Sequence, residues 1–177
     1  MIRKATPEDF KECVRVLELA MSEFTEVLFG ESQIQKKMEI FERFFKAKHN
    51  RLSFQNIIVY EKESQICAAM CVYPGCESDF LDMVLNQRLK ALGKNLILKE
   101  CEDDEFYIDS IAVLPSFRGN GYFKALMNEA LNLSKENGFK KTSLITKTPE
   151  IYTKFGFEKV KDLNFYGEIY TKMIKNL

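Results

Sequence analysis

Residues 106–138 read FYIDSIAVLPSFRGNGYFKALMNEALNLSKENG. The opening FYIDSIAV is rich in aromatic and β-branched residues and favours a strand, which Leu114-Pro115 ends because proline cannot donate to a sheet ladder. Arg118-Gly119-Asn120-Gly121 follows as a glycine-bearing turn. Apolar residues then recur at helical spacing up to Asn137-Gly138, a pair typical of a left-handed helix stop. The stretch therefore predicts a strand, a glycine turn and a helix in succession.

A glycine turn in front of a helix is suited to binding an anion. The first N–H groups of a helix lack intrahelical partners, the helix dipole adds partial positive charge there, and glycine lets a bulky anion approach the backbone. No Gly-Lys-Ser/Thr follows, so the turn is not a P-loop. The dinucleotide pattern G-x-G-x-x-G also fails, because Lys124 stands where its third glycine belongs.

The segment IAVLPSFRGNGYFKALM, residues 111–127, resembles the acetyl-CoA-binding motif of the GNAT-type N-acetyltransferase superfamily. That motif is (Gln/Arg)-x-x-Gly-x-(Gly/Ala) after a strand with Ala-Val-x-Pro; Arg118 and Gly121 match it, and Phe123 occupies the last small position. The resemblance implies that loop 117–123 holds the pyrophosphate and that backbone 111–113 lies along the pantetheine arm, where an N–H group receives the thioester oxygen. The implied cofactor-binding residues are Ile111, Ala112, Val113, Arg118, Gly119, Asn120, Gly121, Tyr122 and Phe123.

A second segment, Tyr152-Thr153-Lys154-Phe155-Gly156-Phe157, resembles the family's Tyr-x-x-x-Gly-Phe block. In that block the tyrosine faces the cofactor sulfur, where a phenol can protonate or hydrogen-bond the departing thiolate. Tyr152 is therefore the candidate general acid, with a core tyrosine on a short helix as the alternative. The preceding link, residues 146–149, is short and lacks the Asn that many relatives carry there.

An alkylammonium must lose a proton before it can attack a thioester, so a base is needed. Asp109 lies within the central strand, and a period of two places it on one face with Tyr107, Ile111 and Val113. A carboxylate in an apolar strand is unfavourable unless it is solvated or paired, and a cleft would solvate it. The alternative is a structural acid bonded to backbone or facing water at a sheet edge. Asp109 is the candidate base; Glu31 and Glu105 are secondary candidates.

The rest of the chain alternates strands and helices. Short strands are expected at 2–5, 56–61, 65–74, 141–146 and 165–174, and helices at 10–24, 31–48, 80–92 and 149–155, with a polar link at 50–53. This order predicts an α/β fold with a mixed sheet and helices on its faces. By resemblance it is a GNAT-like fold with an extra helix inserted before the central strand, forming a single domain over residues 1–177.

Composition narrows the function classes. The 177 residues are 46% hydrophobic with zero net charge, which gives no argument for binding nucleic acid or an acidic membrane. Five cysteines without a signal peptide predict a cytoplasmic protein with reduced thiols, and no apolar run reaches membrane-span length. The lone His49 and the pair Cys67 and Cys71 predict no metal site. The acidic run 100–105 predicts a solvated loop or, alternatively, an electrostatic attractor for a cationic amine.

The sequence thus predicts an acetyl-CoA-dependent N-acetyltransferase that acts without metal on a primary amine of a small molecule or peptide, by direct attack in a ternary complex. Two alternatives remain: a non-catalytic CoA-binding sensor or scaffold with the same fold, and transfer of a longer acyl group. Family habit suggests a homodimer.

Overall fold

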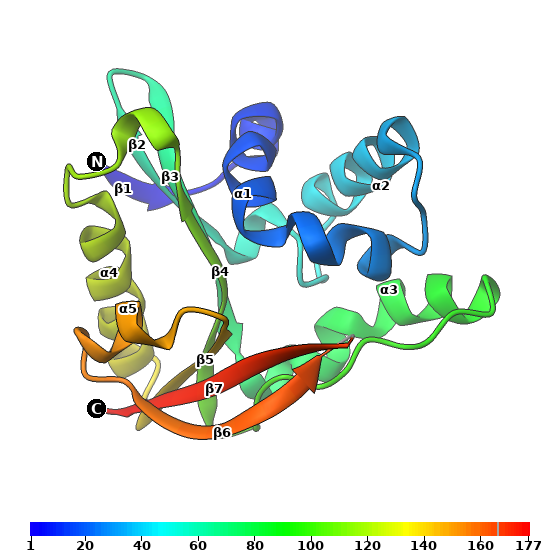
Figure 1. Ribbon diagram of the computed structural model, residues 1–177. Coiled ribbons are helices and arrows are strands. Elements are labelled where there is room, and N and C mark those ends of the chain that lie inside the picture. The colour runs from blue at the N-terminus through cyan, green and yellow to red at the C-terminus, as the bar shows by residue number, and fades with distance from the viewer. Residues whose placement is uncertain (166) are drawn as a thin grey trace.

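The computed structural model describes residues 1–165 and 167–177, and leaves the side chains of residues 22 and 23 undescribed. A mixed seven-stranded sheet runs through it in the order β1-β2-β3-β4-β5-β7-β6 (Figure 1). The strands are β1 (Ile2–Lys4), β2 (Ile57–Lys62), β3 (Gln65–Pro74), β4 (Glu105–Val113), β5 (Lys141–Thr146), β6 (Glu158–Phe165) and β7 (Glu168–Asn176). Among the described strands, the β4–β5 pair is parallel and the other neighbouring pairs are antiparallel.

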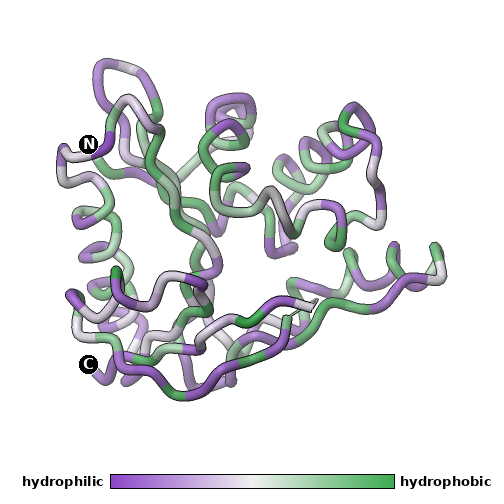
Figure 2. Tube along the Cα trace, viewed as in Figure 1, coloured by the Kyte–Doolittle hydropathy of each residue, from purple (hydrophilic) through white to green (hydrophobic). Residues whose placement is uncertain are grey.

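Helices cover both faces of this sheet. They are α1 (Phe10–Phe29), α2 (Ile34–Lys46), α3 (Ser78–Ala91), α4 (Tyr122–Glu136) and α5 (Pro149–Thr153). Residues of α1, α2 and α3 share one hydrophobic core on one face, while α4 packs on the other face in a second core. Hydropathy follows this arrangement in Figure 2, where hydrophobic residues are frequent along the central strands β3 and β4 and the β2–β3 turn is hydrophilic. The mixed α/β prediction is confirmed.

The predicted strand, glycine turn and helix are β4, the turn at 118–121 and α4. Gly138 ends this unit with φ of +79°, the left-handed conformation predicted for it. The β2–β3 hairpin is also confirmed, and its turn residues Glu63 and Ser64 both have positive φ, as a primed turn requires. β3 is buried along nearly its whole length, as its continuous apolar sequence predicts.

Three local predictions need correction. Helix α2 begins at Ile34, later than expected, and that side chain is exposed because it stands at the free first turn. The closing segment 165–174, expected as one strand, contains the end of β6 and most of β7, with a turn at Gly167, whose φ is +88°. Residue 166 lies outside the described residues. The polar link 50–53 is buried: Asn50 and Ser53 bond to nearby backbone, and Arg51 finds partners on distant elements.

Helix α3 occupies the place predicted for an inserted helix, directly before the segment that leads into β4. Whether it is additional to the family's usual elements stays a prediction. Among the described residues, no helix is both long and apolar enough to cross a membrane.

Candidate active site

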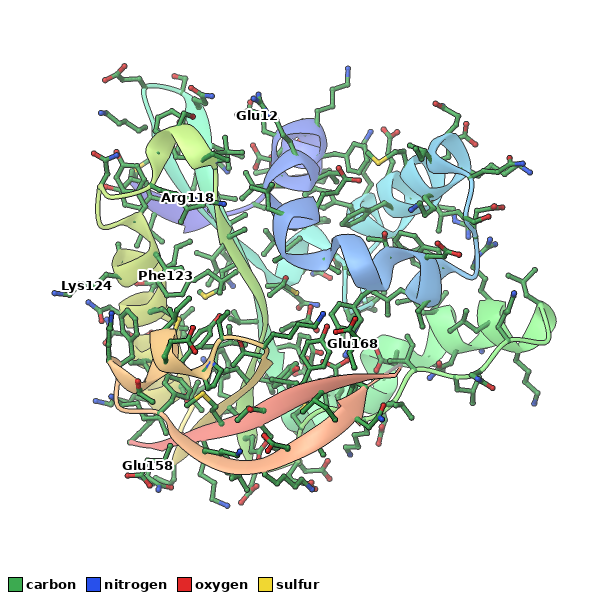
Figure 3. The ribbon with its side chains drawn as sticks, in the orientation of Figure 1. Glu12, Arg118, Phe123, Lys124, Glu158 and Glu168 are labelled. Carbon is green, nitrogen blue, oxygen red and sulfur yellow. The ribbon has the colours of Figure 1, made fainter. Side chains whose placement is uncertain are left out.

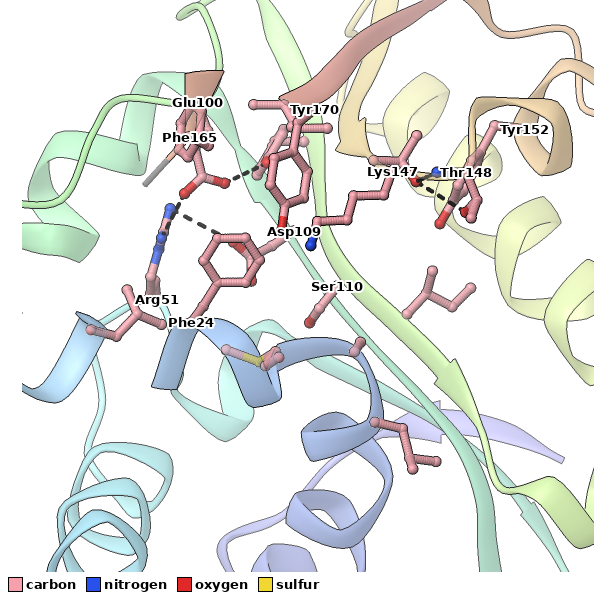
Figure 4. A pocket seen from close by; sticks show the side chains of 18 residues that line it. Phe24, Arg51, Glu100, Asp109, Ser110, Lys147, Thr148, Tyr152, Phe165 and Tyr170 are labelled. Carbon is pink, nitrogen blue, oxygen red and sulfur yellow. Dashed lines mark hydrogen bonds and ion pairs between the residues drawn. The ribbon is translucent and has the colours of Figure 1, made fainter. Parts of the chain in front are cut away.

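A pocket opens where the two central strands part. In the described part of the chain, β4 and β5 pair from Glu105–Lys141 to Ile108–Leu144, and beyond this point β4 continues alongside β3. The pocket there has a volume of about 370 Å³ and is walled by α1, β4, β5, the link to α5 and the β6–β7 hairpin (Figure 4). The splayed strands therefore create the space that the site occupies.

A β-bulge in β4 turns two neighbouring polar side chains into this pocket. Cys71 pairs with Ser110 and Val72 pairs with Ile108, so Asp109 is the extra residue. A bulge breaks the alternation of faces, and both Asp109 and Ser110 line the pocket.

The prediction of which residues share a face with Asp109, based on a period of two, is therefore wrong in part. Tyr107 lies with Asp109 on the α1 face, but Ile111 and Val113 pack in the core on the α4 side. The extra residue at the bulge shifts the parity of every following position in the strand.

A buried arginine closes one end of the pocket. Arg51, 3% exposed, lies in the segment predicted to be a polar link. Its Nη1 lies 3.0 Å from Glu100 Oε1, and its Nε lies 2.9 Å from Asp82 Oδ1 without hydrogen-bond alignment. Its Nη2 donates to the Tyr73 hydroxyl at 2.7 Å.

Asp109 belongs to the same cluster. Its Oδ1 lies 3.6 Å from Arg51 Nη2 and accepts a hydrogen bond from the Tyr73 hydroxyl at 3.2 Å. Glu100 also accepts a hydrogen bond from Tyr107. Among the described residues, Oδ2 of Asp109 has no hydrogen-bond partner, so this oxygen is available to a ligand in the pocket.

Crowding of acids around one guanidinium changes their titration. Burial raises the pKa of Asp109 to about 6; Arg51 opposes this shift and Glu100 adds to it. Burial likewise raises the pKa of Asp82 to about 7. Desolvation also raises the pKa values of the Tyr73 and Tyr107 phenols well above their usual value, so both remain neutral donors at physiological pH.

Tyr152 lies on α5 and lines the same pocket. Burial raises the pKa of its phenol to about 12, and contact with Thr146 partly opposes the shift. Its ring packs against Phe123 at 5.9 Å between centroids and against Phe157 at 6.3 Å. The large residue at the motif's small position thus supports the tyrosine. Figure 3 shows Phe123 on the inner side of α4 and Lys124 directed away from the sheet.

A second cavity, of about 330 Å³, lies at the start of α4. Its lining includes eight of the nine predicted cofactor-binding residues, namely Ile111, Ala112, Val113, Arg118, Gly119, Gly121, Tyr122 and Phe123. The ninth, Asn120, is not in the wall; its amide donates to the carbonyls of Phe117 and Arg118 and shapes the turn.

The turn leaves room for a ligand at the backbone. Gly119 and Gly121 have φ of +80° and +78°, and an added Cβ would meet nothing within 4 Å at either residue. Gly121 is also the N-cap of α4, and no side-chain cap bond is found there. The start of α4 therefore borders open space in the cavity, as anion binding at a helix start requires.

The two cavities adjoin. Leu19 and Ile111 line both of them, so a ligand seated along β4 at the start of α4 would extend toward Asp109 and Tyr152. This shared wall brings the predicted cofactor residues and both predicted catalytic residues to one continuous site.

The two secondary base candidates lie elsewhere. Glu31 is not in the pocket wall, and its carboxylate accepts the backbone N–H groups of Ser32 and Gln33. Glu105 is buried in the sheet, where its Oε2 lies 3.0 Å from Lys172 Nζ and accepts the Ser143 hydroxyl. The acidic run is accordingly only partly a solvated loop.

Sequence reasoning missed Arg51, Tyr73 and Asp82, and it named Glu100 only within the acidic run 100–105. A charged arginine beside Leu52 in a short link carries no local sign of burial, and Glu100 is hidden in a run of exposed acids. Within the described residues, no group of three or more His, Cys, Asp or Glu side chains is placed to hold a metal ion. Cys67 and Cys71 are buried free thiols, and His49 is exposed.

Comparison with known proteins agrees with this geometry. The profile of the Acetyltransferase (GNAT) family matches residues 14–157. A solved N-acetyltransferase from Staphylococcus aureus Mu50 is 25% identical, with TM-score 0.82 over 98% of this chain and 99% of that one. A structure titled only as an acetyltransferase is 24% identical, with TM-score 0.79 over 99% and 98%.

A more distant GNAT acetyltransferase from Brucella melitensis, solved with acetyl-CoA, is 21% identical, with TM-score 0.54 over 97% of this chain and 85% of that one. A search of curated proteins finds no match. Because the family profile covers most of the chain and the fold agrees along its whole length, the chain belongs to the GNAT family of acetyltransferases and is an N-acetyltransferase.

Proposed function

We propose that this N-acetyltransferase uses acetyl-CoA as its acetyl donor and a primary amine as acceptor, and that residues 1–177 act as one domain. The observation that carries the proposal is the shared wall of Leu19 and Ile111, which joins the cavity at α4 to the pocket holding Tyr152 and Asp109. An elongated donor and a compact acceptor need two adjoining spaces of this kind.

The residues at α4 fit the donor. The open N–H groups at the helix start and the two glycines with positive φ suit a diphosphate, and Arg118 lines the same cavity. Backbone 111–113 would hold the pantetheine arm, because β4 lacks a β5 partner there in the described structure and offers unpaired N–H groups. Bound acetyl-CoA supplies an activated thioester. One of these N–H groups is placed to stabilise developing charge on the thioester oxygen.

Tyr152 is the proposed acid. A phenol with a pKa of about 12 stays protonated at neutral pH and can donate a hydrogen bond to the sulfur as negative charge develops there. This phenol is a much weaker acid than an ordinary thiol. Tyr152 therefore stabilises the departing thiolate more by donating a hydrogen bond than by transferring its proton, until the thiolate is desolvated. The contact with Phe123 fixes the ring in one orientation.

Asp109 is the proposed base. A pKa of about 6 leaves the carboxylate mostly ionised at pH 7 yet more basic than an ordinary aspartate. Its open Oδ2 can take a proton from the ammonium directly or through one water molecule. The hydrogen bond from Tyr73 to Oδ1 holds the carboxylate in place while it does so.

Calorimetric titration with acetyl-CoA, followed by a thiol-release assay over a panel of amines, tests the proposal. Binding in the micromolar range and CoA release that depends on amine are expected. Binding without release from any amine would favour the sensor or scaffold alternative, and no binding would overturn the proposal. Release that is faster with propionyl- or succinyl-CoA than with acetyl-CoA would favour a longer acyl group.

The setting of the protein remains an expectation. Its free thiols suit a reducing compartment such as the cytoplasm. The acceptor is a small molecule or peptide amine, with no role proposed for nucleic acid or membrane, and the homodimer is an expectation that sedimentation of the full chain would check.

A further inference from the structure

The closed end of the acceptor pocket carries more negative than positive charge. Three carboxylates, on Asp82, Glu100 and Asp109, share the single guanidinium of Arg51. Among the side chains that the structure describes, Lys147 is the other cation in the pocket wall, and it is already paired with Glu168 at 2.7 Å.

This surplus survives the chemistry proposed above. When Asp109 takes up the proton of the reacting amine it becomes neutral. Glu100 then still shares one arginine with Asp82, whose pKa of about 7 leaves it partly ionised at neutral pH. A buried cluster that is short of positive charge favours a ligand that supplies it, since an uncompensated buried carboxylate is unfavourable.

An unmet hydrogen-bonding group lies in the same wall. Ser110 is more than nine-tenths buried, lines the pocket, and has no hydrogen-bond partner for its Oγ among the described residues. The bulge places it next to Asp109 on the α1 face of β4, and Figure 4 shows the two side chains as neighbours in the wall. Buried hydroxyls are normally satisfied, so an unpartnered one at a cavity points to a ligand.

Aromatic rings complete the wall. Phe24 and Tyr170 pack at 5.5 Å between centroids, and Phe165 packs on Tyr170 at 6.3 Å. The Tyr170 ring already receives a cation, because Lys147 Nζ lies 5.1 Å from its centroid. Ring faces next to carboxylates suit an organic cation, with a short alkyl chain against the rings.

From these observations we propose that the acceptor is a short alkyl diamine, whose second ammonium is held against the Ser110 hydroxyl in the field of Glu100 and Asp82. This inference rests on the proposed function, because it names the acceptor of that same site. Amino acids are disfavoured, since their carboxylate would meet Glu100 and Asp109, the two acids of the cluster that line the pocket.

Three ligands of matched length test the charge requirement: 1,4-diaminobutane, n-butylamine and 4-aminobutanoate. Calorimetric dissociation constants, measured with the full chain saturated with CoA, should show the diamine binding at least about tenfold more tightly than butylamine, and 4-aminobutanoate binding most weakly. Equal affinity for diamine and butylamine, or preference for 4-aminobutanoate, would overturn the inference.

Two variants test the residues. Glu100→Gln keeps the shape of the side chain and removes one charge, so it should reduce the affinity ratio of diamine to butylamine at least about fivefold, and Ser110→Ala should reduce it about threefold. Glu102→Gln removes an exposed acid two residues away and is the matched control, with no change expected. A ratio that stays constant in both test variants would refute the assignment, since mere loosening of the fold would weaken both amines alike.

The binding readout separates this inference from the proposed function. Tight, selective diamine binding without acetyl transfer would leave the cation site standing and remove the enzymatic role proposed for this pocket. Acetylation of butylamine as rapid as that of the diamine would leave the enzymatic role standing and remove the cation site.

Discussion

Replacing Arg51 with methionine tests the cluster on which the acceptor pocket rests. Methionine retains most of the hydrocarbon stem, so the change removes chiefly the charge and the donors. The guanidinium contacts Asp82, Glu100 and Tyr73 at 2.9, 3.0 and 2.7 Å with only 3% of its side chain exposed. Removing one partner of a buried ion pair costs about 3–5 kcal/mol, because the remaining charges lose their compensation.

We therefore expect Arg51→Met to lower the free energy of unfolding by about 4 kcal/mol at pH 8. The loss should shrink as pH falls, because the orphaned carboxylates can then become neutral by taking up protons, and each protonation costs about 1.4 kcal/mol less per pH unit. Urea denaturation followed by far-UV circular dichroism at pH 8 and pH 5.5 measures this, since the chain has no tryptophan for fluorescence.

Arg3→Met is the matched control. Arg3 also faces two acids, Asp9 and Glu61, at 2.7 and 2.5 Å, but 29% of its side chain is exposed. Water therefore screens its ion pairs, and we expect a loss of about 1 kcal/mol. If Arg51→Met loses no more than Arg3→Met, or if its loss is the same at both pH values, the reasoning about buried charge is refuted.

Three further predictions address titration, catalysis and donor binding. The contribution of Asp82 to stability should fall as pH rises from about 4 to about 7, because folded Asp82, with a pKa of about 7, keeps a proton that the unfolded state has lost. The stability of Asp82→Asn relative to wild type, measured by urea titration, should therefore rise over this range, and a difference that does not change with pH would contradict the reasoning. Tyr152→Phe should lower kcat at least about tenfold and leave KM for acetyl-CoA within about twofold, whereas near wild-type turnover of a good amine would remove Tyr152 from its role. Gly121→Ala should cost about 1 kcal/mol of stability and weaken CoA binding about tenfold in calorimetry. Gly93→Ala is the control: this glycine also has positive φ and open space around it but lies outside the cavity, so its substitution should cost the same stability and leave CoA binding intact. Equal CoA affinity in both variants would argue against the helix start as the diphosphate site.

The central motif was predictable because its information is local. A strand ending before Pro115, a glycine turn and an amphipathic helix each depend on neighbouring residues, and β4 and α4 have nearly the expected bounds. The continuous apolar run of β3 similarly predicts a strand buried on both faces.

The acceptor end was not predictable in the same way. The bulge at Asp109 depends on how β3 and β4 pair, which the period of one strand does not reveal, so the expected face-mates Ile111 and Val113 were wrong. Arg51 and Glu100 each look like surface residues in their own segments. Arg51 is buried and Glu100 is largely withdrawn from solvent because the two meet across 49 positions of sequence.

The Arg51 cluster draws on five separate segments: the link before β2, strand β3, helix α3, the chain leading into β4, and β4 itself. The donor cavity, by contrast, is built mostly from one continuous stretch. The two halves of the site therefore differ in modularity. Grafting residues 111–123 onto a related scaffold would transfer most of the donor cavity and leave Asp109, Ser110 and the Arg51 cluster behind, so selectivity in this protein can diverge while its donor chemistry stays constant.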